Sequence, residues 1–404
     1  MSAKADAQGS GGLSAVSIAA LGLVVGVGSV TTDMYFPAMP SLQRELAVDA
    51  AAVQATLSVY LVGLAAGQLL FGPVSDRLGR RVPMLGGLLL YVVGSLLAAA
   101  AQDLWSLLGA RFLQAAGAAA GLVVARAMVT DRYRGQAAAR LQSLLTQILA
   151  IASIGAPVVG GWLVTVSDWR TIFVVLAVLG AGAALVAASC LRETLPPAHR
   201  SRGGLGANVR AWRGLLADRG YVLFVLTASF PMAAIYALIL GSTFVLIDGY
   251  GWSPGEYGLF YALTSVVFVV AGWLNDRALR RWQAAAILSV TLPAMTLAAA
   301  AMFAAALAGL FSAALLVAGM AAIMALLAFI YGNIVAVTME RARDRAGLGA
   351  GLLGATQYAV SSLVAAAGGL FDDPILAMAG ATVLFMLPAV PCYWLALSHR
   401  RASR

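Results

Sequence analysis

The stretch GPVSDRLGRR, at residues 72–81, returns in altered form as GWLNDRALRR at residues 272–281. The copies lie 200 residues apart and agree at five positions, which are one glycine, one aspartate and three arginines. Each copy follows a long apolar run. The repeat therefore predicts a chain built from two halves of related structure, as in membrane proteins with parallel internal repeats.

The apolar runs are long enough to cross a membrane. Hydrophobic residues make up 61% of the chain and charged residues 11%, whereas soluble domains have about 45–50% and about 25%. Residues 284–333 contain no charged side chain, which is room for two crossings at roughly 20 residues each. Continuous runs favour helices over a barrel. We therefore expect an all-α membrane protein.

Twelve transmembrane helices account for the runs. We expect them at about 14–40, 51–74, 83–101, 104–130, 138–166, 170–191, 220–247, 254–274, 284–306, 309–338, 347–370 and 375–397. Residues 1–191 would form an N-terminal six-helix bundle and residues 220–404 a C-terminal one. Residues 192–219 between them, with six arginines, Pro196, Pro197, Gly203 and Gly204, read as a polar cytoplasmic linker.

Basic residues predict the orientation. With the N-terminus in the cytoplasm, 22 of the 26 lysines and arginines fall in cytoplasmic segments, as the positive-inside bias requires. Both termini are thus expected in the cytoplasm. The net charge of +9 is then explained by cytoplasmic loops that lie beside anionic lipid headgroups, and we expect no nucleic-acid partner. The first apolar run lacks a clear cleavage site, so it is expected to stay as the first helix.

Several motifs carry a family resemblance. Residues 72–81 resemble the loop 2–3 signature of the major facilitator superfamily (MFS), which implies two pseudo-symmetric six-helix bundles. TDMYFPAMP at 32–40 resembles helix 1 of Bcr/CflA-type drug:proton antiporters, and RFLQAAG at 111–117 is similar to a helix 4 motif of proton-coupled members. The antiporter motif of helix 5 is matched by Gly155, Pro157, Gly160 and Gly161, with Ala156 replacing the usual glycine.

Asp33 is the one acidic residue of 17 that does not fall in a loop or at a helix end. A charge at the bilayer centre costs at least roughly 2.5–3.5 kcal/mol, so such a group is expected to face a cavity and to have a function. We interpret Asp33 as the proton-coupling group. The resemblance agrees, since Bcr/CflA-type exporters carry an aspartate at this place. The structural alternative is a carboxylate that helps helix 1 to end before Pro37.

Arg111 lies about seven residues inside helix 4, and its charge needs an acceptor or a wet cavity. We predict that it favours proton loss from a nearby acid. The alternative is a structural arginine bonded to backbone carbonyls. Gln114 follows one turn later on the same face.

A cytoplasmic gate is predicted from the loop 2–3 signature and the end of helix 4. Asp76 and Arg80 are four residues apart and can pair across a helical turn, Asp131 ends helix 4, and Gly79 would supply the turn. Arg77 and Arg81 complete the signature. The resemblance implies that these charges lock the inner side in one conformation. Ordinary positive-inside topology accounts for some of the arginines.

Other polar and aromatic residues inside the helices are candidates for lining a mostly apolar substrate cavity, although such groups also join helices. They are Tyr35, Phe36, Gln114, Gln142, Gln147, Met232, Tyr236, Tyr261, Asn333, Gln357 and Tyr358. The C-terminal half has no charge inside a helix, which suits lipophilic drugs better than sugars or phosphates.

Together these features predict an inner-membrane exporter that exchanges small, mostly lipophilic drugs for protons by alternating access. The open alternatives are an exporter of one native metabolite and, less in keeping with Pro157, a symporter. HExxH and Walker A motifs are absent, and the GxGxxG match GAGLLG at 349–354 lacks the preceding strand of a nucleotide site. We therefore expect no enzyme activity, no metal and no cofactor. The expected partners are substrate, protons and lipid, and we expect a monomer.

Overall fold

The computed structural model describes residues 14–133, 135–200, 205–342 and 346–402. Gly203 and Gly204 of the predicted linker lie outside this part of the chain. Six of the basic residues assigned to cytoplasmic segments also lie outside it, namely Lys4, Arg134, Arg202, Arg343, Arg345 and Arg404.

Helices make up the described fold, and no described residue belongs to a strand. Twelve spans in the described ranges are long and apolar enough to cross a membrane, which confirms the predicted number. The helices of the first six spans are α1 (Ala15–Tyr35), η1 (Phe36–Ala38), α2 (Met39–Leu46), α3 (Ala50–Leu78), α4 (Arg81–Ala99), α5 (Leu104–Arg132), α6 (Gly135–Val166) and α7 (Trp169–Cys190). Those that follow are η2 (Pro197–His199), α8 (Leu205–Leu216), α9 (Arg219–Phe244), η3 (Val245–Gly249), α10 (Pro254–Ala278), α11 (Ala284–Leu307), α12 (Ala313–Arg341), α13 (Ala346–Ser361), α14 (Val364–Gly368), α15 (Pro374–Met386) and α16 (Ala389–Ala402).

Four predicted segments need correction. The first span was expected to end near residue 40, but it continues through η1 and α2 to Leu46. Pro37 and Pro40 lie in first turns, where a missing N–H costs no helical hydrogen bond. The last two spans are each broken in two, and the break after α15 precedes Pro388. The polar linker contains a helix, α8, which packs on α9 and α13.

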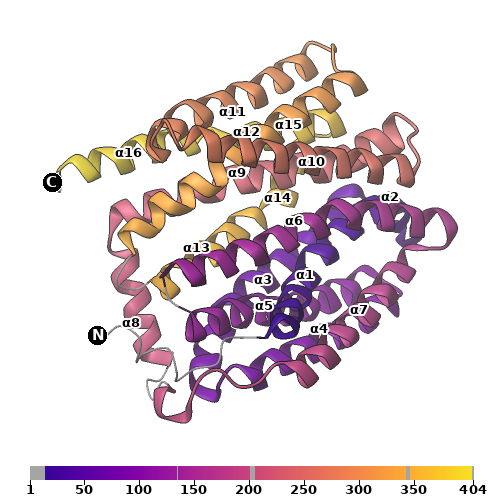
Figure 1. Cartoon of the computed structure of the whole chain (residues 1–404). Coiled ribbons are helices and arrows are strands. Elements are labelled where there is room, and N and C mark those ends of the chain that lie inside the picture. Colours follow the sequence, from indigo (N-terminus) through magenta and orange to yellow (C-terminus); the bar gives the residue numbers. More distant parts are fainter. Residues whose placement is uncertain (1–13, 134, 201–204, 343–345, 403–404) are drawn as a thin grey trace.

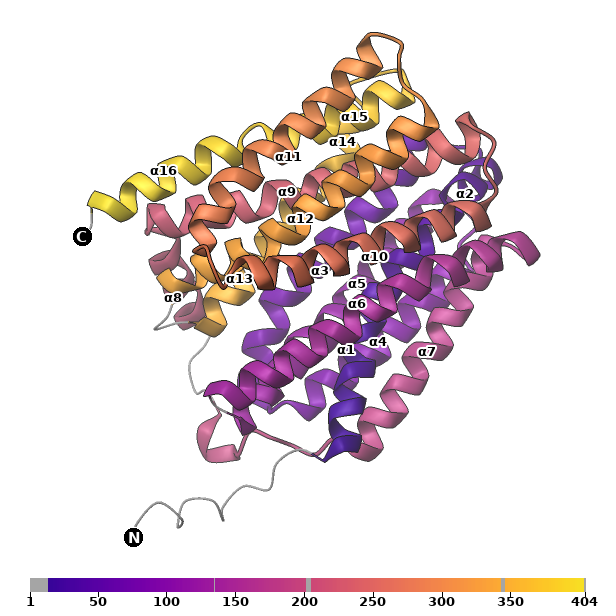
Figure 2. The same ribbon diagram turned by 45° about the horizontal axis from the view of Figure 1, so that its top comes forward.

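The helices pack as two groups, which we call the first half (α1–α7) and the second half (α9–α16). In the first half α5 packs on α3 and α4, and α1 on α6 and α7; in the second half α9 packs on α13, α15 and α16. Figure 1 shows the indigo to magenta helices below the orange and yellow ones. The halves meet where α6 packs along α10, as Figure 2 shows, and where α3 packs on α13.

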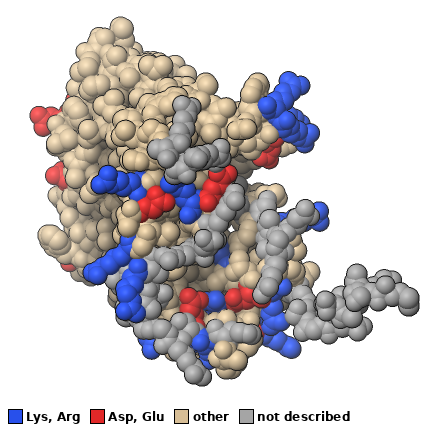
Figure 3. All heavy atoms as spheres, turned by 90° about the vertical axis from the view of Figure 1, so that its left-hand side faces the viewer, with Lys and Arg blue, Asp and Glu red and all other residues tan. Residues whose placement is uncertain are grey.

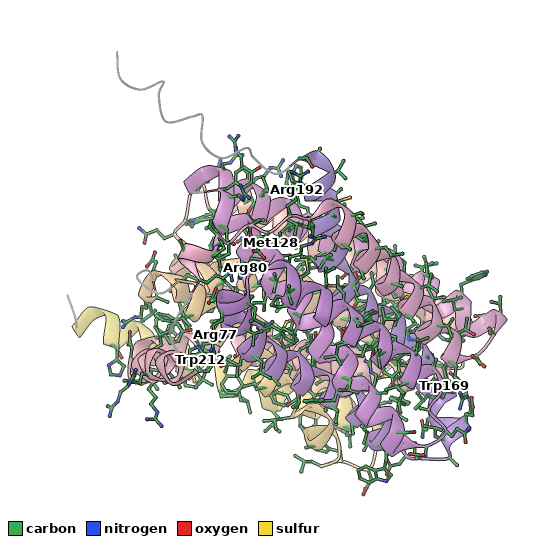
Figure 4. The ribbon with its side chains drawn as sticks, turned by 90° about the horizontal axis from the view of Figure 1, so that it is seen from below. Arg77, Arg80, Met128, Trp169, Arg192 and Trp212 are labelled. Atoms are coloured by element: carbon green, nitrogen blue, oxygen red, sulfur yellow. The ribbon has the colours of Figure 1, made fainter. Side chains whose placement is uncertain are left out.

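The two ends of the bundle differ in content. The last turns of α16 and the helix α8 lie at one end, which we call the inner end, and α2 lies at the opposite or outer end (Figure 1). Basic and acidic side chains gather on the inner end when it faces the viewer (Figure 3). In Figure 4, Arg80 lies toward the inner end, far from Trp169 at the outer end.

Close helix packing in the first half depends on glycine. At Gly117 of α5, an added Cβ would overlap the backbone nitrogen of Tyr91 and the carbonyl oxygen of Gly87 in α4. At Gly63 and Gly67 of α3, it would overlap the backbone of α5. Such close approach lets helices associate by van der Waals packing in a membrane.

Replacing Gly117 by alanine is expected to lower the melting temperature, because overpacking typically costs about 1–3 kcal/mol. The matched control is Gly109→Ala in the same helix, where an added Cβ meets nothing within 4 Å and where alanine has the better helix propensity. Thermal unfolding in detergent, followed by circular dichroism, compares the two variants. Equal melting temperatures would contradict the tight α4–α5 contact.

Candidate functional site

Asp33 lies between the two halves of the molecule. It belongs to α1 and its residue is only 7% exposed. Its carboxylate accepts a hydrogen bond from the Tyr261 hydroxyl of α10, at 3.3 Å, and the Ser153 hydroxyl of α6 lies beside it. No described residue forms an ion pair with it. A buried acid held only by hydroxyl groups is a suitable place to bind and release a proton.

Aromatic residues surround this carboxyl group. The ring of Phe36 packs edge to face on Tyr261, with centroids 5.6 Å apart. Tyr60 of α3 and Tyr236 of α9 also lie within electrostatic reach of Asp33. Phe36, Tyr236 and Tyr261 were predicted to line a substrate cavity. Tyr60 was not predicted, because an aromatic residue inside an apolar helix is usually a core residue.

The predicted antiporter motif lies on the contact between α6 and its neighbours. An added Cβ at Gly160 would overlap the backbone of Met34, one residue after Asp33, and one at Gly161 would overlap the backbone of Pro254 in α10. From the other side, a Cβ at Gly258 would overlap the Pro157 carbonyl oxygen. Gly155 differs, since nothing lies within 4 Å of its Cβ position. Pro157 and Gly161 of the motif therefore bring the two halves together, whereas Gly160 packs α6 on α1 beside Asp33.

Arg111 is fully buried within the first half, and no described contact joins it to Asp33. Its Nη1 donates to the Gln114 side chain at 2.7 Å, and Gln114 donates to Ser95 at 2.9 Å. Its guanidinium carbon lies 4.4 Å and 4.2 Å from the ring centroids of Tyr35 and Tyr60. Nε and Nη2 have no hydrogen-bond acceptor in the described part of the chain. Cation–π contacts thus take the place of the acceptor that was expected.

The outer ends of the two halves are joined by a charge pair that the sequence did not reveal. Arg44 of α2 donates to Asp248 of η3 at 2.8 Å. The adjacent Glu45 pairs with Arg170 and accepts from the Trp169 indole at 2.7 Å, which fastens α2 to α7. The sequence had marked Arg44 only as a basic residue outside the cytoplasmic segments, because its partner lies 204 positions away.

At the inner end, the predicted gate charges come together around Arg80. Its guanidinium donates to Asp76 at 2.5 Å and to Asp131 at 2.9 Å. Gly79 ends α3 with a φ of +93°, a conformation that glycine adopts easily. Arg81 donates to the Ala188 carbonyl at 2.6 Å, and the exposed Arg77 takes no part in the cluster. All of these residues belong to the first half.

Glu193, which was not predicted from the sequence, bonds to the backbone of the loop that carries Arg80 and Arg81. Its carboxylate accepts from the backbone nitrogens of residues 80, 81, 194 and 195, at 2.8, 3.2, 3.0 and 2.9 Å. Partial burial opposes ionisation, but the four N–H groups outweigh it and lower the pKa of Glu193 below its ordinary value of 4.5. Nothing in the residues around Glu193 signals that it faces the loop after α3.

The other predicted substrate residues fall into two groups. The polar groups of some already form hydrogen bonds within their own half of the molecule. Tyr35 shares a hydrogen bond with Thr56 at 2.5 Å, Asn333 donates to Asn275 at 2.8 Å, and Gln357 donates to the Ala228 carbonyl at 3.3 Å. The rest vary in burial. Met232, Tyr236 and Tyr358 are half-buried, Gln142 donates to the Arg126 carbonyl, and Gln147 lies on the exposed face of α6 with Leu144 and Ile151.

Comparison with known families agrees with this architecture. The family model "Major Facilitator Superfamily" matches residues 21–366. The chain therefore belongs to the Major Facilitator Superfamily, and it is a multi-pass membrane transporter.

Its relatives include transporters of antibiotic resistance, as the sequence motifs predicted. A bicyclomycin resistance protein homologue of Haemophilus influenzae is 27% identical over 96% of this chain and 98% of its own length. A chloramphenicol resistance protein of Pseudomonas aeruginosa is 33% identical over 64% of this chain and 61% of its own length. An uncharacterised MFS-type transporter of Bacillus subtilis is 37% identical, and the match covers 64% of either chain. The chain thus spans less than two thirds of the last two relatives.

Solved structures share the fold. A bacterial homologue of the human lysosomal transporter Spinster, inward-facing and unoccupied, has a TM-score of 0.71 at 19% identity, over 94% of this chain and 96% of its own. A D-xylose–proton symporter has a TM-score of 0.70 at 14% identity, over 94% of this chain and 99% of its own. At these identities the likeness concerns the fold alone.

Replacing Glu193 by glutamine is expected to lower the melting temperature at neutral pH. A carboxyl whose folded pKa lies below its unfolded value stabilises the fold above the unfolded pKa, and this stabilisation is lost as the pH falls through the folded pKa. The deficit of Glu193→Gln should therefore shrink as the pH drops below 4.5. Melting curves in detergent across pH 3.5–7 (about half a unit apart) test this.

The control for this experiment is Asp372→Asn, at an exposed outer-loop carboxyl that accepts no hydrogen bond within the described residues. A constant deficit at every pH, or none at pH 7, would rule out the stabilising role of the Glu193 carboxylate.

Proposed function

We propose that this transporter exports small, mostly lipophilic molecules, such as chloramphenicol- or bicyclomycin-like antibiotics, in exchange for protons. The two resistance-protein relatives support the substrate class. The observation that carries the proton coupling is Asp33, a buried acid without a charged partner among the described residues, at the contact between the halves. An intramembrane ionisable group in such a place is by default a functional site.

The proposed orientation puts the inner end in the cytoplasm and the protein in a bacterial inner membrane. The distribution of basic residues supports this, since the loops at the inner end carry most of them. Residues 1–191 and 220–404 would move as two units joined by the cytoplasmic linker 192–219. In that orientation, the conformation described here has its periplasmic ends joined through Arg44 and Asp248.

The proposed cycle is alternating access, driven by the proton gradient without a cofactor. Protonation of Asp33 from the periplasm favours substrate release and the return of the empty site. Proton loss toward the cytoplasm makes the site ready for the next substrate. The cluster of Arg80, Asp76 and Asp131 would act as a switch at the cytoplasmic side, and Arg111 would hold the first-half aromatic residues that surround Asp33.

The test is proton flux in liposomes that contain a pH-sensitive dye and the reconstituted protein. Addition of chloramphenicol, or of other lipophilic antibiotics, is expected to produce substrate-dependent proton movement in the wild type. Asp33→Asn should reduce this flux to the background of empty liposomes, because an amide side chain does not bind and release a proton in this pH range. Asp372→Asn serves as a control and should retain the wild-type flux.

The outcomes separate the alternatives. Flux that survives in Asp33→Asn would keep the antiporter and reject Asp33 as its proton carrier. No flux with any drug in folded wild-type protein would reject the drug specificity and favour an exporter of one native metabolite.

A further inference from the structure

One hydrogen bond at the proposed proton site crosses from one half of the molecule to the other. The hydroxyl group of Tyr261 belongs to α10 of the second half, and the Asp33 carboxylate that it meets belongs to α1 of the first half. Tyr261 is itself only 6% exposed. The other hydroxyl on this carboxylate, from Ser153 of α6, comes from the same half as Asp33.

The bond lies beside a close backbone contact between the halves. Gly258, one turn before Tyr261 in α10, faces the Pro157 carbonyl oxygen of α6 so closely that a Cβ would overlap it. The Phe36 ring, three residues after Asp33, packs on the Tyr261 ring. Any movement of α10 away from α6 at this level would therefore carry Tyr261 away from Asp33.

No cation among the described residues pairs with this carboxylate. The titratable groups that face Asp33 from neighbouring elements are tyrosines: Tyr60 from α3, Tyr236 from α9, and Tyr257 and Tyr261 from α10. From α5, Arg111 turns toward the rings of Tyr35 and Tyr60; from α7, Arg170 pairs with Glu45 at the outer end. The Tyr257 hydroxyl bonds within the second half: it donates to the Ile239 carbonyl at 3.1 Å and accepts from the Thr243 hydroxyl at 2.8 Å.

We infer that Tyr261 transmits the charge state of Asp33 to the contact between the two halves, so that the ionised carboxylate holds the outer ends together and protonation loosens them. This inference rests on the proposed function, because it takes Asp33 as the proton carrier. Tyr261 acts as a positioning residue and carries no proton through the cycle.

The physical reason is the difference in strength between two hydrogen bonds. A hydroxyl donates more strongly to a carboxylate than to a neutral carboxylic acid, because the ionised acceptor carries a full charge. The distance of 3.3 Å is long for a hydroxyl donor, so we take hydrogen-bond free energies from the lower end of their usual range. These correspond to about a tenfold effect on an equilibrium for the charged acceptor and about twofold for the neutral one.

The direction of this coupling, in which ionised Asp33 favours joined outer ends, suits an exporter that is driven by protons. A state that favours the carboxylate binds the proton less tightly, by thermodynamic linkage. With the outer ends joined, Tyr261 would help Asp33 to release its proton toward the inner side. With the outer ends apart, that bond is lost, and Asp33 would retain a proton that arrives from outside.

The experiment measures the opening of the outer end directly. Spin labels are placed at Gln102→Cys and Ala308→Cys, which are exposed outer-loop positions in the first and second halves, after Cys190 and Cys392 are replaced by serine. Pulsed electron paramagnetic resonance then gives the distances between the labels, and from them the ratio of closed to open populations, between pH 5 and 9 (about one unit apart) in detergent. Relative to the wild type, Tyr261→Phe should lower this ratio about tenfold at high pH and about twofold at low pH.

Two variants serve as matched controls. Tyr257→Phe removes a hydroxyl from the same helix, but one that bonds within the second half, and should keep the wild-type pH response. Ser153→Ala removes the other hydroxyl from Asp33 without breaking a bond between the halves. It should move the pH midpoint and leave the amplitude of the response unchanged.

The remaining outcomes separate this inference from the proposed function. Asp33→Asn should abolish the pH response; if it does not, Asp33 is rejected as the proton carrier, and both this inference and that part of the proposed function fail. If Asp33→Asn abolishes the response while Tyr261→Phe, folded and monodisperse, keeps its full amplitude, the role of Tyr261 is rejected and the proposed function stands.

Discussion

A carboxylate inside a bilayer has to be stabilised by protein groups, because lipid supplies no hydrogen bonds. At Asp33 this requirement is met by hydroxyls from two other helices, one from each half of the molecule. The stabilisation of one buried charge is thereby tied to the contact between α1, α6 and α10. A change of charge at this position cannot be confined to one half.

Glycine makes that contact possible. Gly160, Gly161 and Gly258 let the backbones of α1, α6 and α10 approach until no side-chain atom would fit between them. A surface packed this closely is either joined or apart, since intermediate separations would lose the dispersion contacts without admitting lipid or water. The hydroxyl of Tyr261 lies at the edge of this surface, where a bond of modest strength can bias the balance between the two arrangements.

The charged residues of the chain are treated differently according to depth. Near the ends of the bundle they pair with opposite charges, as Arg44 does with Asp248 and Arg80 with Asp131. Deeper inside, Arg111 has no acid among the described residues and rests on the rings of Tyr35 and Tyr60 instead. This arrangement leaves Asp33 without a cation that would hold it permanently ionised.

Much of the architecture could be read from the sequence because a membrane constrains it strongly. Length and hydropathy were sufficient to predict twelve helices, and the resemblance of residues 72–81 was sufficient to predict the superfamily. Asp33 stood out for the same reason, since a charge in an apolar run is conspicuous. The continuation of the first span to Leu46 escaped prediction, because Pro37 and Pro40 read as breakers although they lie in first turns.

The pair of Asp76 and Arg80 could be predicted from its spacing, but the long-range partners of the other polar groups were decided by the tertiary structure. Asp248 lies 204 positions from Arg44, and Tyr261 lies 228 positions from Asp33. Glu193 meets the loop after α3 across a separation of 113 positions. Local patterns report on a helix and its burial, but they do not specify which side chains of two separately formed halves come within bonding distance. The sequence by itself placed an acid inside an apolar helix, whereas packing between the halves decided that a tyrosine of the opposite half would bond to it.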